Sequence, residues 1–162
     1  MNEDSMEKEV RRGVRFNKIA LAVLAVLAVV GVWALLSWFS RPLDDSITPD
    51  GLAENLTDGA LGKTGGVYYV LDDGSALVDA LELSGWTVTQ TEAEGEPLVV
   101  FRLWEDCELA LYEGGLAYAW NGYASSDTTG AVWYTIPEDT AQTVASLLRT
   151  DGQIETSPSI RF

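Results

Sequence analysis

The sequence predicts an α+β fold, in which one apolar N-terminal helix precedes a small, mainly antiparallel sheet with two helices on one face. Three observations predict it. Residues 19–39 form an apolar run of 21 residues without a charge. After residue 66, short segments rich in β-branched and aromatic residues are separated by turn-forming residues, which is typical of antiparallel strands. Two further segments repeat apolar residues at helical spacing.

The apolar run is long enough to cross a bilayer, because at the helical rise per residue it covers about 30 Å. The apolar core of a cleaved signal peptide is shorter, roughly 7–15 residues, and ends at small residues. Here the run ends in the bulky rings of Trp38 and Phe39. We therefore expect an uncleaved, single-pass transmembrane helix over residues 19–39, a signal-anchor.

The flanking charges predict the orientation of this helix. The nearest basic residues after the run are Arg41 and Lys63, whereas a basic cluster precedes it. That cluster consists of Lys8, Arg11, Arg12, Arg15 and Lys18. Since positive residues stay on the cytoplasmic side, residues 1–18 are expected to be a cytoplasmic tail. The chain after the run is expected to be extracytoplasmic, at the cell membrane.

The segment after the span is expected to be a linker, because residues 40–66 are rich in Asp, Gly, Thr and Pro, and glycines interrupt any helical pattern. An extracytoplasmic α+β domain is predicted over residues 67–162. It begins with a strand at 67–71. A helix follows from Ser75 to about Leu83, where the next glycine ends it.

The rest of the domain reads as strands and one closing helix. The strands are predicted over residues 86–90, 98–104, 108–112, 116–123 and 131–136. The Gly-Gly pair before residue 116 supplies the positive φ angles of a tight hairpin. The closing helix begins at Pro137, which suits a first helical turn. The tail after residue 153 is expected to add an edge strand through Ile160 and Phe162.

Charge restricts the partners of the outer domain. Residues 42–162 contain four basic and 21 acidic residues, a net charge of −17. Nucleic acid and anionic lipid headgroups are repelled by such a charge. We expect a partner, whether a protein or a cell-wall component, to be basic. The high charge also keeps an exported domain soluble, which is the more ordinary explanation.

The residues needed for common catalytic sites are missing. The sequence has no histidine, which excludes Ser-His-Asp and Cys-His mechanisms and histidine-bearing zinc sites. The single cysteine, Cys107, lies between two acidic residues that disfavour its thiolate, so it is expected to be an unreactive packing residue. We predict no enzyme and no catalytic, cofactor-binding or metal-binding residue.

The most apolar predicted strand separates two kinds of side chain. Val99, Phe101 and Leu103 are expected to point to one face of the sheet, and Phe101 to lie in the core. Arg102 and Trp104 are expected to point to the other face. The charge of Arg102 indicates that its face is the open one.

Further rings are expected to join Arg102 on the open face. They are Tyr112, Trp133 and, depending on the register, either Tyr118 and Trp120 or Asn121. An open aromatic face with one arginine can hold a peptide, a glycan or a partner protein. The alternative is that the linker or the C-terminal tail covers this face, or that the rings belong to the core. The candidate binding residues are Arg102, Trp104, Tyr112 and Trp133.

This plan, over about residues 7–150, resembles that of small single-pass proteins of Gram-positive bacteria that carry an α+β extracytoplasmic domain. No specific motif carries the resemblance, so it implies a role at the cell surface and transfers no site residues. The predicted function is a membrane-tethered binding or interaction module. The alternatives are a sensory or regulatory subunit whose residues 1–18 touch a cytoplasmic partner, and a cell-wall hydrolase, which the missing histidine disfavours.

Overall fold

The computed structural model describes residues 23–33, 41–104 and 106–156, and the chain divides into two compact units, 1–41 and 42–162. In the first unit, residues 23–33 are helical and all their side chains are exposed. Within the described ranges, no helix has the length and hydropathy needed to cross a membrane. The predicted span over 19–39 extends outside the described residues on both sides.

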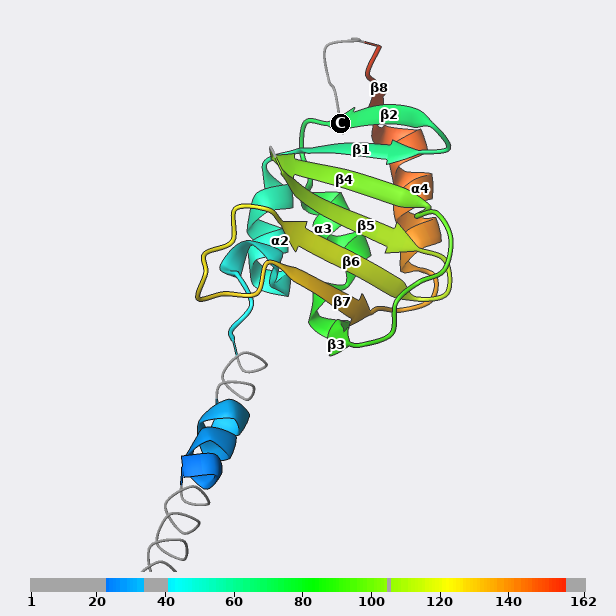
Figure 1. Cartoon of the computed structure of the whole chain (residues 1–162). Helices are drawn as coiled ribbons and strands as arrows, with labels where there is room; N and C mark the ends of the chain where they lie inside the picture. The colour runs from blue at the N-terminus through cyan, green and yellow to red at the C-terminus, as the bar shows by residue number, and fades with distance from the viewer. Residues whose placement is uncertain (1–22, 34–40, 105, 157–162) are drawn as a thin grey trace, which may run out of the picture. The chain divides into compact units, whose positions relative to one another are not determined.

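The second unit is an α+β fold in which an eight-stranded antiparallel sheet is covered on one face by helices (Figure 1). The strand order is β3-β7-β6-β5-β4-β1-β2-β8. The strands are β1 (Ala60–Thr64), β2 (Val67–Leu71), β3 (Thr87–Thr89), β4 (Val99–Trp104), β5 (Cys107–Tyr112), β6 (Leu116–Asn121), β7 (Ala131–Thr135) and β8 (Gln153–Ile154). The predicted fold class and the antiparallel pairing are therefore confirmed.

The helical layer is larger than the predicted pair of helices. It contains three α-helices, together with two short 3-10 helices, in the part of the chain that the structure describes. They are α2 (Pro49–Thr57), α3 (Ser75–Leu81), α4 (Thr140–Asp151), η1 (Asp45–Ile47) and η2 (Leu83–Gly85). In Figure 1 the α-helices lie behind the sheet, so the viewer sees the opposite, helix-free face.

The predicted linker over residues 40–66 is wrong for most of its length, since η1, α2 and β1 occupy it. Thr48 caps the start of helix α2, because its hydroxyl accepts a hydrogen bond from the Gly51 amide. Leu52 and Leu56 on one face of the helix are fully buried. In β1, a Cβ on Gly62 would lie 2.8 Å from both Leu148 and Phe101. Gly51, which was expected to interrupt a helix, lies within α2, and Gly62 permits close packing in β1.

The core lies between the sheet and the helices. Phe101 on β4 is completely buried there, as predicted, with Leu109 and Leu111 of β5 beside it. Two buried polar groups of aromatic residues are also paired in the core. The Tyr134 hydroxyl donates to the Ile47 carbonyl at 2.7 Å, and the Trp86 indole donates to the Leu81 carbonyl at 2.8 Å.

Cys107 also belongs to the core and is buried, which confirms the prediction that it packs. Burial raises the pKa of its thiol to about 11. Removal from water disfavours the thiolate more than the neighbouring acidic side chains do, so the cysteine is unreactive mainly because it is desolvated.

The C-terminal edge strand forms earlier in the chain than predicted. Gln153 and Ile154 of β8 pair with Val70 and Tyr69 of β2. Ile160 and Phe162, which were expected to make this strand, lie outside the described residues. The closing helix α4 starts at Thr140, three residues after Pro137, which was expected to lie in its first turn.

A polar network fastens the start of the domain to the sheet. The Asp44 carboxylate accepts hydrogen bonds from the Ser46 amide at 3.2 Å, the Asn121 side chain at 3.1 Å and the Thr128 hydroxyl at 3.4 Å. Leu43 forms a parallel bridge with Thr129. The Ser46 hydrogen bonds are the main reason that the pKa of Asp44 lies below its ordinary value.

Candidate functional site

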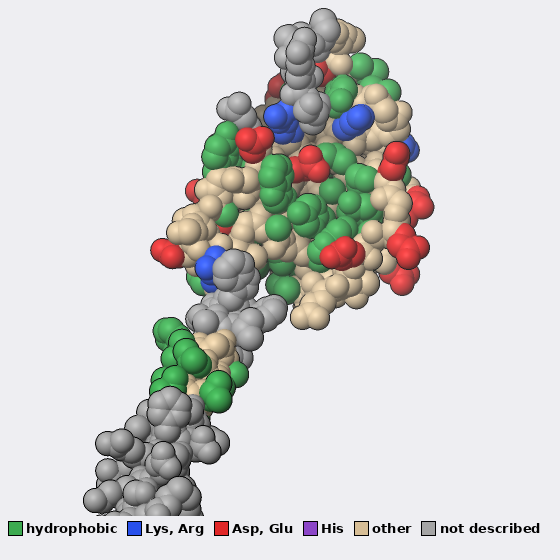
Figure 2. All heavy atoms as spheres, in the orientation of Figure 1, with side chains coloured by type: hydrophobic (Ala, Val, Ile, Leu, Met, Phe, Trp, Pro, Cys, Tyr) green, Lys and Arg blue, Asp and Glu red, His purple; other side chains and the backbone are tan. Residues whose placement is uncertain are grey.

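The helix-free side of the sheet, here called the bare face, carries the predicted site. The strand register aligns its side chains in rows across the strands. One row reads Leu61, Arg102, Glu108, Trp120 and Ala131, and the next reads Lys63, Val100, Ala110, Tyr118, Trp133 and Thr89. Figure 2 shows hydrophobic side chains gathered at the centre of this face, with charged groups among and around them.

Three rings form an aromatic cluster on the bare face. The Trp133 ring lies 5.2 Å from the Tyr112 ring and 4.9 Å from the Tyr118 ring, between centroids, with interplanar angles of 43° and 41°. All three side chains are half-buried. Burial, followed by the nearby Glu108 charge, raises the pKa of both tyrosine hydroxyls, so they stay neutral and can donate hydrogen bonds.

Trp120 stands beside this aromatic cluster, two residues from Tyr118 along β6 and on the same face. It is 38% exposed, more than the three clustered rings. With Arg102, Asp106, Cys107 and Glu108 it lines a hollow of about 120 Å³. The bare face therefore offers a packed aromatic surface next to a small charged depression.

Glu108 is the carboxylate at the centre of this arrangement. It faces Arg102 across the β4–β5 ladder and Trp120 across the β5–β6 ladder. Burial raises its pKa, and the positive charge of Arg102 opposes that shift. Among the residues that the structure describes, no group donates a hydrogen bond to its carboxylate. A half-buried charge without a donor is electrostatically under-compensated.

Trp104 does not lie on the bare face, which corrects one of the four predicted site residues. Strict alternation along β4 would place it with Arg102. The register instead shifts between them, so that Arg102 pairs with Glu108 and Trp104 with Cys107. Leu103 is the extra residue of a β-bulge, which turns Trp104 towards the helical side. There Trp104 packs against the core and lines a hollow with residues of α2 and η1.

The structure distinguishes the alternatives for the other predicted residues. Arg102, Tyr112 and Trp133 lie on the bare face, together with Tyr118 and Trp120. Asn121 points into the helical side, where it binds Asp44 and Ser46. Residues 45–57, part of the predicted linker, pack as η1 and α2 on the opposite side and do not cover the bare face (Figure 1). Residues 157–162 of the C-terminal tail, the other candidate to cover it, lie outside the described residues.

Glu108 is the site residue that sequence reasoning missed. It was considered only as a neighbour of Cys107. The signal was present in β5, where the alternation of Cys107, Leu109 and Leu111 towards the core assigns Glu108 and Tyr112 to the other face.

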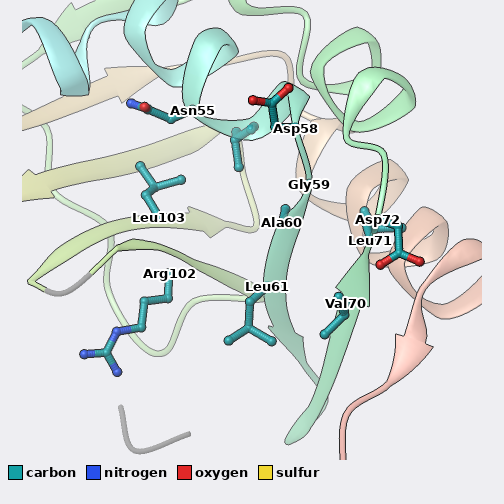
Figure 3. Close-up of a pocket in the computed structure, with 11 residues that line it drawn as sticks. Asn55, Asp58, Gly59, Ala60, Leu61, Val70, Leu71, Asp72, Arg102 and Leu103 are labelled. Carbon is teal, nitrogen blue, oxygen red and sulfur yellow. The ribbon is translucent and has the colours of Figure 1, made fainter.

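A second hollow lies at the ends of β1 and β2, beside the end of α2 (Figure 3). Its volume is about 370 Å³ and apolar side chains such as Leu61 and Val70 form much of its wall. The Arg102 guanidinium points away from the carboxylates of Asp58 and Asp72 in this view. Polar groups therefore do not converge here. Nowhere in the described ranges do three acidic or cysteine side chains gather closely enough to hold a metal ion.

Comparison of the chain with protein-family models, with curated proteins and with solved structures finds no match in any of the three. The function is therefore argued from the residues of the bare face.

Proposed function

We propose that this protein is a membrane-tethered, extracytoplasmic interaction module that binds its partner through the bare face of the sheet. The observation that carries the proposal is the aromatic cluster of Tyr112, Tyr118 and Trp133, half-buried on a sheet face without helices. Aromatic residues with a polar atom are the side chains most often found at the energetic centre of interfaces.

The packing of the rings favours binding. Each ring of the cluster already contacts a neighbour, so little side-chain entropy remains to be lost when a partner covers it. Charged side chains of Arg102, Glu108 and Lys63 stand around the rings. An apolar centre with a polar rim is the usual composition of a protein interface.

The apolar N-terminal run supports the tether. The helix at residues 23–33 exposes Val, Leu and Trp side chains on every side, an arrangement that suits hydrocarbon better than water. The basic residues before the run favour a cytoplasmic N-terminus. The negative charge of residues 42–162 favours a domain held away from anionic headgroups.

A non-catalytic role is part of the proposal. The sequence lacks histidine, and its one thiol is buried with a raised pKa. The bare face presents rings and the Glu108 carboxylate, whose cross-strand neighbour Arg102 is positively charged, and these groups suit recognition better than proton transfer at neutral pH.

Photo-crosslinking in membranes tests the site. A benzophenone amino acid replaces Trp120 in the full chain, expressed in a Gram-positive host. The matched control replaces Ser146, an exposed residue of α4 on the helical side. We expect a defined crosslinked product only from position 120. Equal products from both positions, or a product from position 146 alone, would contradict binding by the bare face.

Protease protection tests the tether and its orientation. Protease added to intact protoplasts is expected to digest residues 42–162 and to leave the N-terminal tail intact. Protection of the C-terminal domain would reverse the orientation. A mature chain that begins near residue 41 would show that the anchor is cleaved.

A further inference from the structure

We propose that the partner of the bare face is an extended basic peptide segment, in which one lysine or arginine side chain lies on Trp120 beside Glu108. This inference rests on the proposed function and adds the chemistry of the partner. It is carried by the carboxylate of Glu108, the hollow next to it, the spacing of the rings and the charge of the domain.

The Glu108 carboxylate favours a cationic partner. It is half-buried beside aromatic rings, and no described residue donates a hydrogen bond to it. Arg102, the cross-strand neighbour of Glu108 and a lining residue of the same hollow, supplies one positive charge. An ammonium or guanidinium group from a partner would donate the missing hydrogen bonds, and charge-assisted bonds of this kind are the stronger ones.

The hollow beside Glu108 has room for such a head group. It measures about 120 Å³ and is lined by Trp120, Glu108 and Asp106, with Arg102 and Cys107 completing its wall. A long basic side chain can lay its stem along an aromatic ring while its charge reaches a carboxylate. The bare face already contains one such contact, since the Lys63 ammonium lies 5.2 Å from the centre of the Tyr68 ring.

The spacing of the rings fits an extended segment. Trp120 and Tyr118 are two residues apart on one strand, which separates their Cα atoms by about 7 Å. Alternate side chains of an extended peptide have the same spacing. A basic residue at one position on Trp120 would therefore place the side chain two residues away on the Tyr118–Trp133 pair, where an apolar group fits best.

Charge supports the same partner and disfavours a neutral glycan. Residues 42–162 carry a net charge of −17, and Glu92 lies close enough to Tyr118 to raise the pKa of its hydroxyl. Such a field accelerates encounter with a basic segment. The tilted rings of the cluster also do not form the single flat surface on which a sugar chain stacks.

The test uses the full chain in non-ionic detergent micelles and a blocked nonapeptide, Arg-Ser-Leu-Ser-Arg-Ser-Leu-Ser-Arg. The indole N–H signals of the six tryptophans are followed by NMR, each assigned by its Trp→Phe variant. Comparison ligands are the same peptide with Glu in place of Arg, and chitohexaose. The variant Glu108→Gln is compared with Glu54→Gln, which removes the same charge from an exposed position of α2.

We expect the basic peptide to shift the Trp120 and Trp133 signals and to leave that of Trp86, buried under the helices, unchanged. Its affinity should fall about fivefold in Glu108→Gln and less than about twofold in Glu54→Gln, because Glu108, unlike Glu54, lies where the bound cation is expected. Should Glu108→Gln lose the Trp86 signal and thus its fold, Trp120→Leu replaces it, with the same expected fall.

Three results would overturn the inference. Equal affinity for the two glutamine variants would show that the peptide responds to overall charge alone. Shifts caused by chitohexaose or by the acidic peptide, without shifts from the basic one, would reject the basic segment and leave the bare face as a binding site. The absence of any shift at Trp120 and Trp133, with no crosslink from position 120, would reject the proposed function as well.

Discussion

The two faces of the sheet are built from the same strands and differ in almost every other respect. On the covered face, Phe101, Leu109 and Tyr134 are at most 1% exposed, and the Tyr134 hydroxyl is paired. On the bare face, the rings of Tyr118 and Trp133 are only half-buried. One face accounts for most of the apolar burial that holds the domain together, and the other leaves part of its apolar area exposed.

Two carboxylates, Asp44 and Glu108, also differ in how well the surrounding residues satisfy them. Asp44 accepts hydrogen bonds from three residues, and its pKa is lowered, mainly by Ser46. Glu108 accepts none from the described residues, and burial raises its pKa. A hydrogen-bonded carboxylate stabilises the fold in its charged form, whereas a desolvated one opposes folding when it is charged. The charge of Asp44 thus stabilises the fold and that of Glu108 does not, which is why we propose a binding role for Glu108.

The largest expected effect lies on the covered face. Phe101→Ala should lower the free energy of unfolding by about 3–5 kcal/mol, because it opens a cavity at a fully buried position. Trp133→Ala on the bare face should cost only about 1–2 kcal/mol, since it loses two aromatic contacts of a half-buried ring. Urea unfolding followed by circular dichroism measures both. Equal decreases in the free energy of unfolding for the two variants would contradict the stated difference in burial between the two faces.

The next effect concerns the network at the start of the domain. Asn121→Ala removes hydrogen bonds to Asp44, Ser46 and the Tyr123 amide, and should cost about 1–3 kcal/mol at pH 7. The same urea titration measures it, with Gln142→Ala as the control, since Gln142 makes a single hydrogen bond at an exposed site. If Asn121→Ala lowers the free energy of unfolding no more than Gln142→Ala does, water replaces the hydrogen bonds of the network without a loss of stability.

The pH dependence of the Asn121→Ala cost sharpens the comparison. Because the native pKa of Asp44 is below 3.8, its contribution to stability is present above that pH and disappears as the pH falls through the native pKa. The difference between wild type and Asn121→Ala should therefore shrink below about pH 3.8. A constant difference would mean that the charge of Asp44 is not what Asn121 supports.

Ionisation of Glu108 should change the stability of the fold in the opposite direction to ionisation of Asp44, and by a smaller amount. Its native pKa lies above 4.5, so the native state holds the proton more tightly, and stability falls as the pH rises through the interval above 4.5. Glu108→Gln, which cannot lose a proton, should gain stability relative to wild type over that interval, by about 0.5 kcal/mol or less. Thermal melts from pH 4 to pH 8 test the sign, and a loss in the variant would contradict the assignment.

The smallest effect is expected at Trp104. Because the bulge at Leu103 turns this ring to the helical side, Trp104→Ala should leave the affinity for the basic nonapeptide within about twofold of wild type. Trp120→Leu, measured in the same titration, is the matched variant on the bare face. A strong loss of affinity in Trp104→Ala would return that ring to the binding surface.

Periodicity predicted the parts of the fold that depend on local patterns. Alternation along β4 correctly assigned Phe101 to the core and Arg102 to the bare face. It failed at Trp104, because a bulge shifts the register and leaves no local signal in the sequence.

Glycine was the other source of error. In residues 40–66 the glycines predicted interrupted helical structure and hence a linker, whereas Gly62 allows β1 to pack against Leu148 and Phe101, a requirement set by distant residues. The site was predictable in part. Tyr112 and Trp133 were found as aromatic residues, but Glu108 was recognised only once its burial and its neighbours were known.

The two ends of the sheet have a consequence for the membrane-tethered protein proposed above, wherever its copies are crowded together. The outermost strands, β3 and β8, contain three and two residues. A long, straight outer strand presents a row of unpaired amides and carbonyls that a second molecule can extend, whereas a row this short offers few such groups. Copies crowded side by side can thus expose their aromatic rings to a partner without growing into a continuous ribbon.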